Sequence, residues 1–167
     1  MERGRGLGTE LWLARAGSAA ELASRLRAFE GIVLGLVLYP PGGEEQRWAE
    51  AFAAASGATL EHAPELAPAA RESAAELAAR AWPVLEEALG RGLTSVLVVL
   101  SREVLLASVA QALALSHEGV AALRVDPGRL VLLRDEPGGI SLRRSNVLAP
   151  ETNPGTALPD GGRARAR

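Results

Sequence analysis

The segment at residues 95–100, which reads SVLVVL, constrains the fold of this chain more than any other. It is β-branched and apolar on both faces, as in a strand that is covered by other structure on either side. Ser101 follows at once and is placed to cap a helix over residues 103–115. The segment therefore predicts a central strand in a sheet that has helices on both faces.

The rest of the chain alternates between strand and helix patterns. Ser18 and Glu21 have capping-box spacing and predict a helix that runs to about Phe29. Pro83 lies inside the longest helical pattern and should kink or interrupt that helix. The other predicted helices cover residues 44–56 and 69–89; strands are predicted over 11–14, 32–39 and 59–62, and extended segments near 121–125, 129–134 and 140–144. This order predicts a three-layer α/β/α sandwich with a mostly parallel sheet.

The composition excludes several kinds of chemistry. The chain has no cysteine, its basic residues are all arginine, and its two histidines are His62 and His117. A thiol nucleophile, a thiolate metal site, a P-loop and a Schiff-base lysine are therefore impossible. We expect no metal and no cofactor. The net charge of −2 gives no reason to expect a nucleic acid or a membrane as partner.

The 167 residues suit one domain. We expect a flexible N-terminus over residues 1–8, a domain over 9–149 and a disordered tail over 150–167, where proline, glycine and threonine are frequent. The first residues lack the apolar core of a signal peptide, and no apolar run is long enough to span a bilayer. The expected compartment is the cytoplasm.

In such a sheet, ligands bind beyond the carboxyl ends of the parallel strands. The residues predicted there are 15–17, 40–44, the segment after His62, and Ser101 with Arg102. These segments also carry a family pattern. Arg15-Ala16-Gly17 follows the first strand, PPGGEEQRWA follows the second, and Arg71-Glu72-Ser73 precedes a long helix that contains Arg80. The family pattern continues with VLVVLSRE at residues 96–103, and it ends with a last strand that reaches Asn146.

From about Thr9 to Ala149 the chain resembles the histidine phosphatase, or phosphoglycerate mutase-like, superfamily. The resemblance implies that family's fold and a pocket that binds a phosphoryl group. In active members a histidine in Arg-His-Gly is the nucleophile, and two arginines and a second histidine hold the phosphoryl oxygens. Here the nucleophile position is Ala16, the second arginine aligns with Glu44, and the second histidine aligns with Ser101. The loop that carries the acid is reduced to Ala-Pro-Ala-Ala.

These replacements imply a catalytically inactive member, a pseudo-phosphatase with a binding, regulatory or structural role. The partner would be a second copy of the chain or another protein. The alternative is a divergent phosphohydrolase or anion-binding protein that uses Arg15 and Gly17 with Arg102 and His62. Arg15 could instead pair with Glu44, which we favour because arginine facing a carboxylate is a common neutral pair.

Three further residues have a simpler interpretation beside a functional one. Ser101 could be a nucleophile, but it lacks the Gly-x-Ser-x-Gly elbow, so a helix cap is favoured. Trp48 replaces a small residue of the family and is predicted to help fill the former pocket. His117 is predicted at the C-terminus of a helix, with no functional role.

Overall fold

A computed structural model describes residues 8–148, and the predicted terminal segments fall almost wholly outside this range. The strands are β1 (Glu10–Arg15), β2 (Leu36–Tyr39), β3 (Thr59–His62), β4 (Ser95–Leu100), β5 (Leu130–Glu136) and β6 (Gly139–Val147). The helices are α1 (Ala19–Ala28), α2 (Gly43–Ser56), the 3-10 turn η1 (Pro64–Leu66), α3 (Ala74–Leu89), α4 (Arg102–Leu113) and α5 (His117–Ala121).

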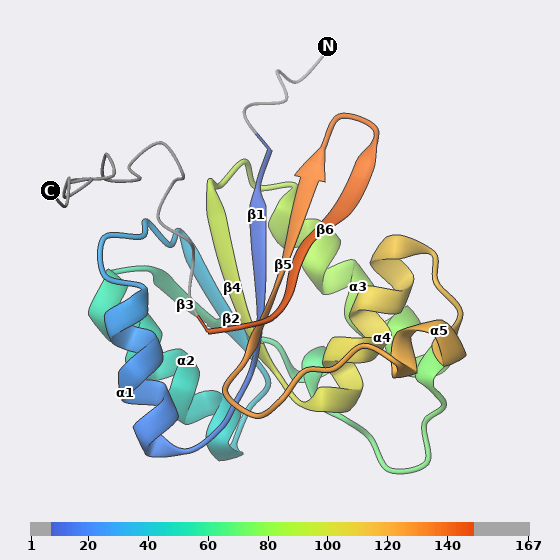
Figure 1. The fold of residues 1–167 in the computed structure, drawn as a ribbon, viewed down its shortest axis with the longest axis horizontal. Helices are drawn as coiled ribbons and strands as arrows, with labels where there is room; N and C mark the ends of the chain where they lie inside the picture. Colours follow the sequence, from blue (N-terminus) through green and yellow to red (C-terminus); the bar gives the residue numbers. More distant parts are fainter. Residues whose placement is uncertain (1–7, 149–167) are drawn as a thin grey trace, which may run out of the picture.

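The strands form one mixed sheet in the order β3-β2-β4-β1-β5-β6. The four strands β3, β2, β4 and β1 are parallel, whereas β5 and β6 run antiparallel to their neighbours. Figure 1 shows α1 and α2 on one face of the sheet and α3, α4 and α5 on the other. The predicted three-layer α/β/α sandwich is confirmed, and its sheet is mostly parallel.

Each face of the sheet has its own core, because alternate residues of a strand point to opposite faces. Leu11 and Leu13 of β1 face the core beneath α3 and α4, whereas Trp12 and Ala14 face the core beneath α1 and α2. All residues of β4 are buried, as its double-sided apolar pattern predicted. In the second core the rings of Trp12 and Phe29 meet edge to face at 5.3 Å between centroids.

Local signals set the helix starts. The predicted capping box of α1 is present: Ser18 Oγ accepts from the Glu21 amide, and the Glu21 carboxylate accepts from the Ser18 amide. A second capping box joins Ser73 and Glu76 and begins α3 at Ala74. The prediction of a helix from residue 69 was therefore five residues early. α3 continues through Pro83 to Leu89, so the prediction that this proline would interrupt the helix was wrong.

Three other predictions need correction. Residues 32–35 are not part of β2, which begins at Leu36; of these four residues, Gly35 already hydrogen-bonds through its backbone to Ser95 of β4 and Thr59 of β3. Residues 122–125 form no strand, because the ladder of β1 with β5 starts only at Leu130. His117 begins α5, with Ser116 as its cap, rather than ending a helix.

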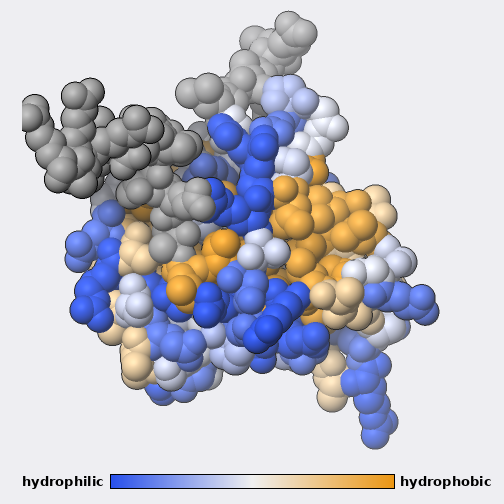
Figure 2. Space-filling view, in the orientation of Figure 1, coloured by the Kyte–Doolittle hydropathy of each residue, from blue (hydrophilic) through white to orange (hydrophobic). Residues whose placement is uncertain are grey.

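The carboxyl ends of β1, β2, β3 and β4 lie at one edge of the sheet, at the bottom of Figure 1. Hydrophilic residues, in blue, dominate the lower part of the face seen in Figure 2. Within residues 8–148, no helix is long and apolar enough to cross a membrane.

Candidate functional site at the carboxyl edge

Two neighbouring strands bring together Ala16 and Ser101, the positions where the resemblance expects histidines. Arg15 of β1 pairs with Leu100 of β4, so Ala16 and Ser101 are the residues that follow directly on adjacent strands. Ala16 is half-buried and packs against the core beneath α1 and α2. Ser101 caps α4, and its Oγ accepts from the Val104 amide at 3.4 Å, as predicted. At these two places the structure presents a methyl group and a hydroxyl that caps a helix.

Gly17 is held tightly within the loop that follows β1. The indole nitrogen of Trp48 donates to the Gly17 carbonyl oxygen at 3.1 Å, and Trp48 is fully buried. A Cβ at Gly17 would lie 2.7 Å from Glu21 Oε1 and 2.8 Å from the Gly128 nitrogen. Only glycine fits there without movement. Trp48 therefore fills space beside this loop, and its role in filling the family's pocket stays a prediction.

Glu44 and Arg15 do not pair, so that favoured interpretation was wrong. Glu44 lies in the first turn of α2, where the i,i+3 spacing brings Arg47 to it: Arg47 Nη1 donates to both Glu44 oxygens, at 3.0 and 3.2 Å. This ion pair is exposed to solvent. The Arg15 guanidinium points elsewhere and donates through Nη1 to the Val125 carbonyl oxygen at 2.7 Å.

The other two residues of the predicted anion site lie on separate elements, α4 and β3. Arg102 is exposed at the start of α4, and His62 is exposed at the end of β3, with its ring 6.3 Å from that of Tyr39. The sheet order puts three strand spacings between β3 and β1, about 14 Å. Among residues 8–148, no hydrogen bond or ion pair joins Arg15, Arg102 and His62. The proposal that they act together stays a prediction.

Glu72 follows the Ala-Pro-Ala-Ala segment and lies two residues before α3. Arg80 of α3 binds both oxygens of the Glu72 carboxylate, at 2.9 and 2.5 Å, and also donates to the carbonyl oxygens of Glu65 and Ala67. The hydrogen bond from Arg80 lowers the pKa of Glu72. Arg71, directly before Glu72, adopts the left-handed φ of 69°.

Sequence reasoning missed a group of arginines around the loop at residues 125–129. Arg25 of α1 is buried, with 6% of its surface exposed, and its Nε donates to the Gly128 carbonyl oxygen at 2.7 Å. Arg15 pairs with the same loop through its backbone, because its amide donates to the Arg129 oxygen and its oxygen accepts from the Gly128 amide. Arg25 and Gly128 are 103 positions apart. No local motif could have joined them.

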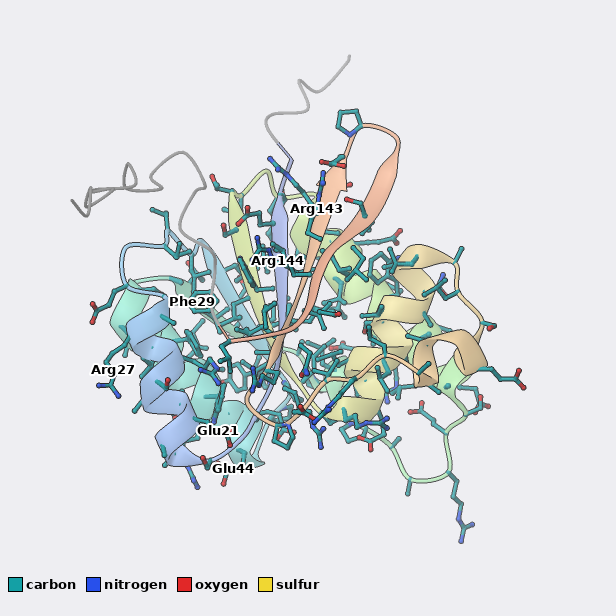
Figure 3. The ribbon with its side chains drawn as sticks, viewed as in Figure 1. Glu21, Arg27, Phe29, Glu44, Arg143 and Arg144 are labelled. Carbon is teal, nitrogen blue, oxygen red and sulfur yellow. The ribbon has the colours of Figure 1, made fainter. Side chains whose placement is uncertain are left out.

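Electrostatics in this group follow from burial and charge. Burial lowers the pKa of Arg25, and the nearby positive charge of Arg129 lowers it further. The pKa of Glu21 lies below its usual value, chiefly because its carboxylate accepts a hydrogen bond from the Ser18 amide. Figure 3 shows Glu21 at the lower end of α1, near the carboxyl edge. In the part of the chain that the structure describes, no cluster of carboxylates and imidazoles is arranged to hold a metal ion.

The fold and this edge define an α/β protein of the phosphoglycerate mutase-like type. The sequence profile of the histidine phosphatase superfamily, branch 1, matches residues 41–148. The chain belongs to the histidine phosphatase superfamily. No curated protein matches the sequence significantly.

Solved structures of several phosphatases share the fold. An alpha-ribazole phosphatase from Shigella flexneri has a TM-score of 0.74 at 15% identity, covering 87% of this chain and 100% of that one. A mutant phosphoserine phosphatase from Entamoeba histolytica, in complex with phosphoserine, has a TM-score of 0.70 at 11% identity, with 84% and 98% covered. A mycobacterial glucosyl-3-phosphoglycerate phosphatase with inorganic phosphate has a TM-score of 0.71 at 14% identity, with 83% and 97% covered. At these identities the likeness is one of fold.

Proposed function

We propose that this protein is a non-catalytic member of its superfamily, a pseudo-phosphatase with a binding, regulatory or structural role. The observation that carries the proposal is the neighbouring pair Ala16 and Ser101 at the ends of β1 and β4. Alanine has no atom that can attack phosphorus, so the covalent route through a phosphohistidine is lost. The Ser101 hydroxyl is engaged as a helix cap.

The charge at the third family position supports the same conclusion. A phosphoryl transition state needs fixed positive donors around its oxygens. Glu44 would offer a negative charge where active members have an arginine, and it is already held by Arg47 on the outside of α2. The Ala-Pro-Ala-Ala loop offers no carboxylate, and Glu72, which follows it, is a poor proton donor because the hydrogen bond from Arg80 lowers its pKa.

The experiment is hydrolysis of a generic phosphomonoester by the purified full chain. We expect no turnover above a buffer blank and no acid-labile phosphoenzyme. An Arg15→Ala variant is the control for contamination, because a trace phosphatase would be equally active in both preparations. Turnover at enzyme-like rates by the wild type that disappears in Arg15→Ala would overturn the proposal.

The role as a binding subunit implies a partner, for which we propose a second copy of this chain or another protein. The alanine-rich helices α2 and α3 allow close helix packing. Sedimentation at several concentrations tests the homodimer. A monomer at all concentrations would leave only the heterologous partner. We also place the protein in the cytoplasm as part of this proposal.

The alternative, an anion-binding protein or divergent phosphohydrolase, is favoured by one observation. Arg15 has no carboxylate partner within residues 8–148, so its charge is available to an anion. Arg102 and His62 would have to reach it across β4 and β2. Phosphate or vanadate should then raise the melting temperature, and the rise should be lost in His62→Ala.

A further inference from the structure

An open apolar groove lies on the α1/α2 side of the sheet, where these two helices end. It holds about 330 Å³, at the low end of the about 300–1,000 Å³ of typical ligand pockets. Its walls are the last turns of α1 and α2 and the segment at residues 30–34 that leads into β2 (Figure 1). The apolar side chains that line it are Leu26, Phe29, Ile32, Val33, Phe52 and Ala55. The groove lies at the amino edge of the parallel strands, so it is separate from the carboxyl-edge site.

The segment at residues 33–34 has the properties of an unpaired strand. Val33 is 75% exposed, the most of any large apolar side chain in residues 8–148. Within that range the backbone amides and carbonyl oxygens of Val33 and Leu34 make no hydrogen bond, whereas the Gly35 amide donates to Ser95 of β4. An extended chain can dock beside such a segment through backbone hydrogen bonds and place a side chain in the adjoining pocket. The groove therefore suits an extended peptide with one apolar side chain.

Negative charge gathers at the same place. Glu30 is exposed on the wall of the groove, and α1 and α2 both direct their C-terminal ends, the negative ends of their dipoles, toward it. Among residues 8–148, no basic side chain lines the groove. Arg25 turns to the Gly128 carbonyl oxygen, and Arg27 projects outward from α1 (Figure 3). An occupant with positive charge is therefore favoured.

Residues 149–167 of this chain carry both of these features. Leu158 is their one large apolar residue. Gly161-Gly162 follows it, and the segment then has three arginines, Arg163, Arg165 and Arg167. Prolines at positions 150, 154 and 159 favour an extended backbone. Such a backbone loses less conformational freedom on docking.

The segment starts on the same side of the sheet as the groove and can reach it. Val147 packs against the core beneath α1 and α2, which also contains Phe29 and Phe52 of the groove. Figure 1 shows the red end of the described chain on the side of α1. From β6 to β2 the sheet order gives four strand spacings, about 19 Å, and the strand registers add about 10–20 Å along the strands. Leu158 lies ten residues beyond Leu148, which allows about 33 Å of extended chain.

We propose that residues 149–167 dock back on their own domain, with Leu158 in the groove beside Val33 and the three arginines around Glu30. Gly161-Gly162 lets the chain turn so that the arginines meet the negative rim. Docking orders only the part near Leu158 of a segment whose composition predicts disorder. The contact is autoinhibitory, because a partner that binds in the groove must first displace the segment. It is independent of the proposed loss of catalysis, which concerns the opposite edge of the sheet.

The test is a spin label in the full chain, which has no cysteine of its own. Ala157→Cys places a nitroxide beside Leu158, and NMR measures the amide signals of the domain. We expect the signals of Val33 and Ala55 to lose intensity, because a nitroxide broadens the signals of nuclei near it. Gln111→Cys is the control label: it is exposed on α4, on the other face of the sheet, and should leave these two signals sharp.

The contact can be removed from either side. Leu158→Asp in the segment and Val33→Asp in the groove should each restore the Ala55 signal, and the exposure of Val33 makes its replacement compatible with folding. Leu115→Asp, an exposed change between α4 and α5, is the matched control and should leave the loss in place. Glutamine at all three arginines should restore part of the signal; an unchanged loss would overturn the contact with Glu30.

Two results would overturn the docking itself. The first is no loss of intensity with the label at residue 157, or a loss that survives both Leu158→Asp and Val33→Asp. The second comes from a mixture of isotope-labelled chains without a nitroxide and spin-labelled chains without the isotope. Broadening at Ala55 in that mixture would show that the segment docks on a second copy rather than on its own domain.

Discussion

The indole nitrogen of Trp48 donates a hydrogen bond to the carbonyl oxygen of Gly17, at 3.1 Å. This bond ties α2 to the loop that carries the catalytic histidine in active relatives. Trp48 is also fully buried and packs its ring 6.2 Å from that of Phe52. At this edge Trp48 therefore joins α2 to the loop after β1 through both a hydrogen bond and buried packing.

Trp48→Phe should lower the free energy of unfolding by about 1–3 kcal/mol, because it removes the donor to Gly17 and some buried volume. Trp48→Ala should lower it by about 3–5 kcal/mol, since it also leaves a large cavity. Urea unfolding followed by circular dichroism measures both. If Trp48→Phe is neutral, the indole hydrogen bond contributes nothing to stability.

Gly17→Ala should destabilise the protein by about 1–3 kcal/mol through overpacking. The new Cβ would lie 2.8 Å from the Gly128 backbone nitrogen, which cannot move as a side chain can. Gly90→Ala is the control, because a Cβ there meets nothing closer than 3.4 Å. Equal unfolding midpoints for the two variants would contradict the close approach of the loops at residues 15–17 and 125–129.

Arg71→Gly should raise the free energy of unfolding, by up to about 1 kcal/mol. Arg71 has a φ of 69°, a left-handed conformation that costs a residue with a Cβ about 1–2 kcal/mol. Glycine removes this cost, but it also makes the unfolded chain more flexible, which cancels part of the gain in stability. Gly57→Ala tests the reverse change, because Gly57 has a φ of 73° with no atom within 4 Å of a new Cβ. It should lose about 1 kcal/mol. A loss of stability in Arg71→Gly would show that the Arg71 side chain makes a stabilising contact.

Acid should weaken the ion pair of Glu72 with Arg80. The pKa of Glu72 lies below its ordinary value of 4.5, so the pair contributes its full stability above that pH and loses it as the pH falls through the folded-state pKa. Glu72→Gln should therefore be less stable than the wild type at neutral pH, and the difference should vanish in acid. Urea unfolding at a series of pH values measures this. Glu86→Gln, an exposed change on α3 at a residue with no ion pair among residues 8–148, is the control for the substitution itself.

The carboxyl-edge site could be predicted only in part. The order of the motifs placed Ala16, Glu44 and Ser101 at strand ends, and β1 and β4 do bring Ala16 and Ser101 side by side. The predicted ion pair of Arg15 with Glu44 was wrong, because the direction of the Arg15 side chain depends on the packing around the end of β1. Glu44 had a closer partner in Arg47, three residues along its own helix.

The sequence by itself determined the layers of this protein and which residues follow its central strands. Both follow from local information: the two-sided apolar strand at residues 95–100, the capping box at Ser18, and the identity of residue 16. Tertiary structure alone decided where the charges meet. Arg25 reaches Gly128, and Trp48 reaches Gly17, only because α1 and α2 pack on one face of the sheet. Contacts over such separations depend on the whole packing of a face, which no window of sequence contains.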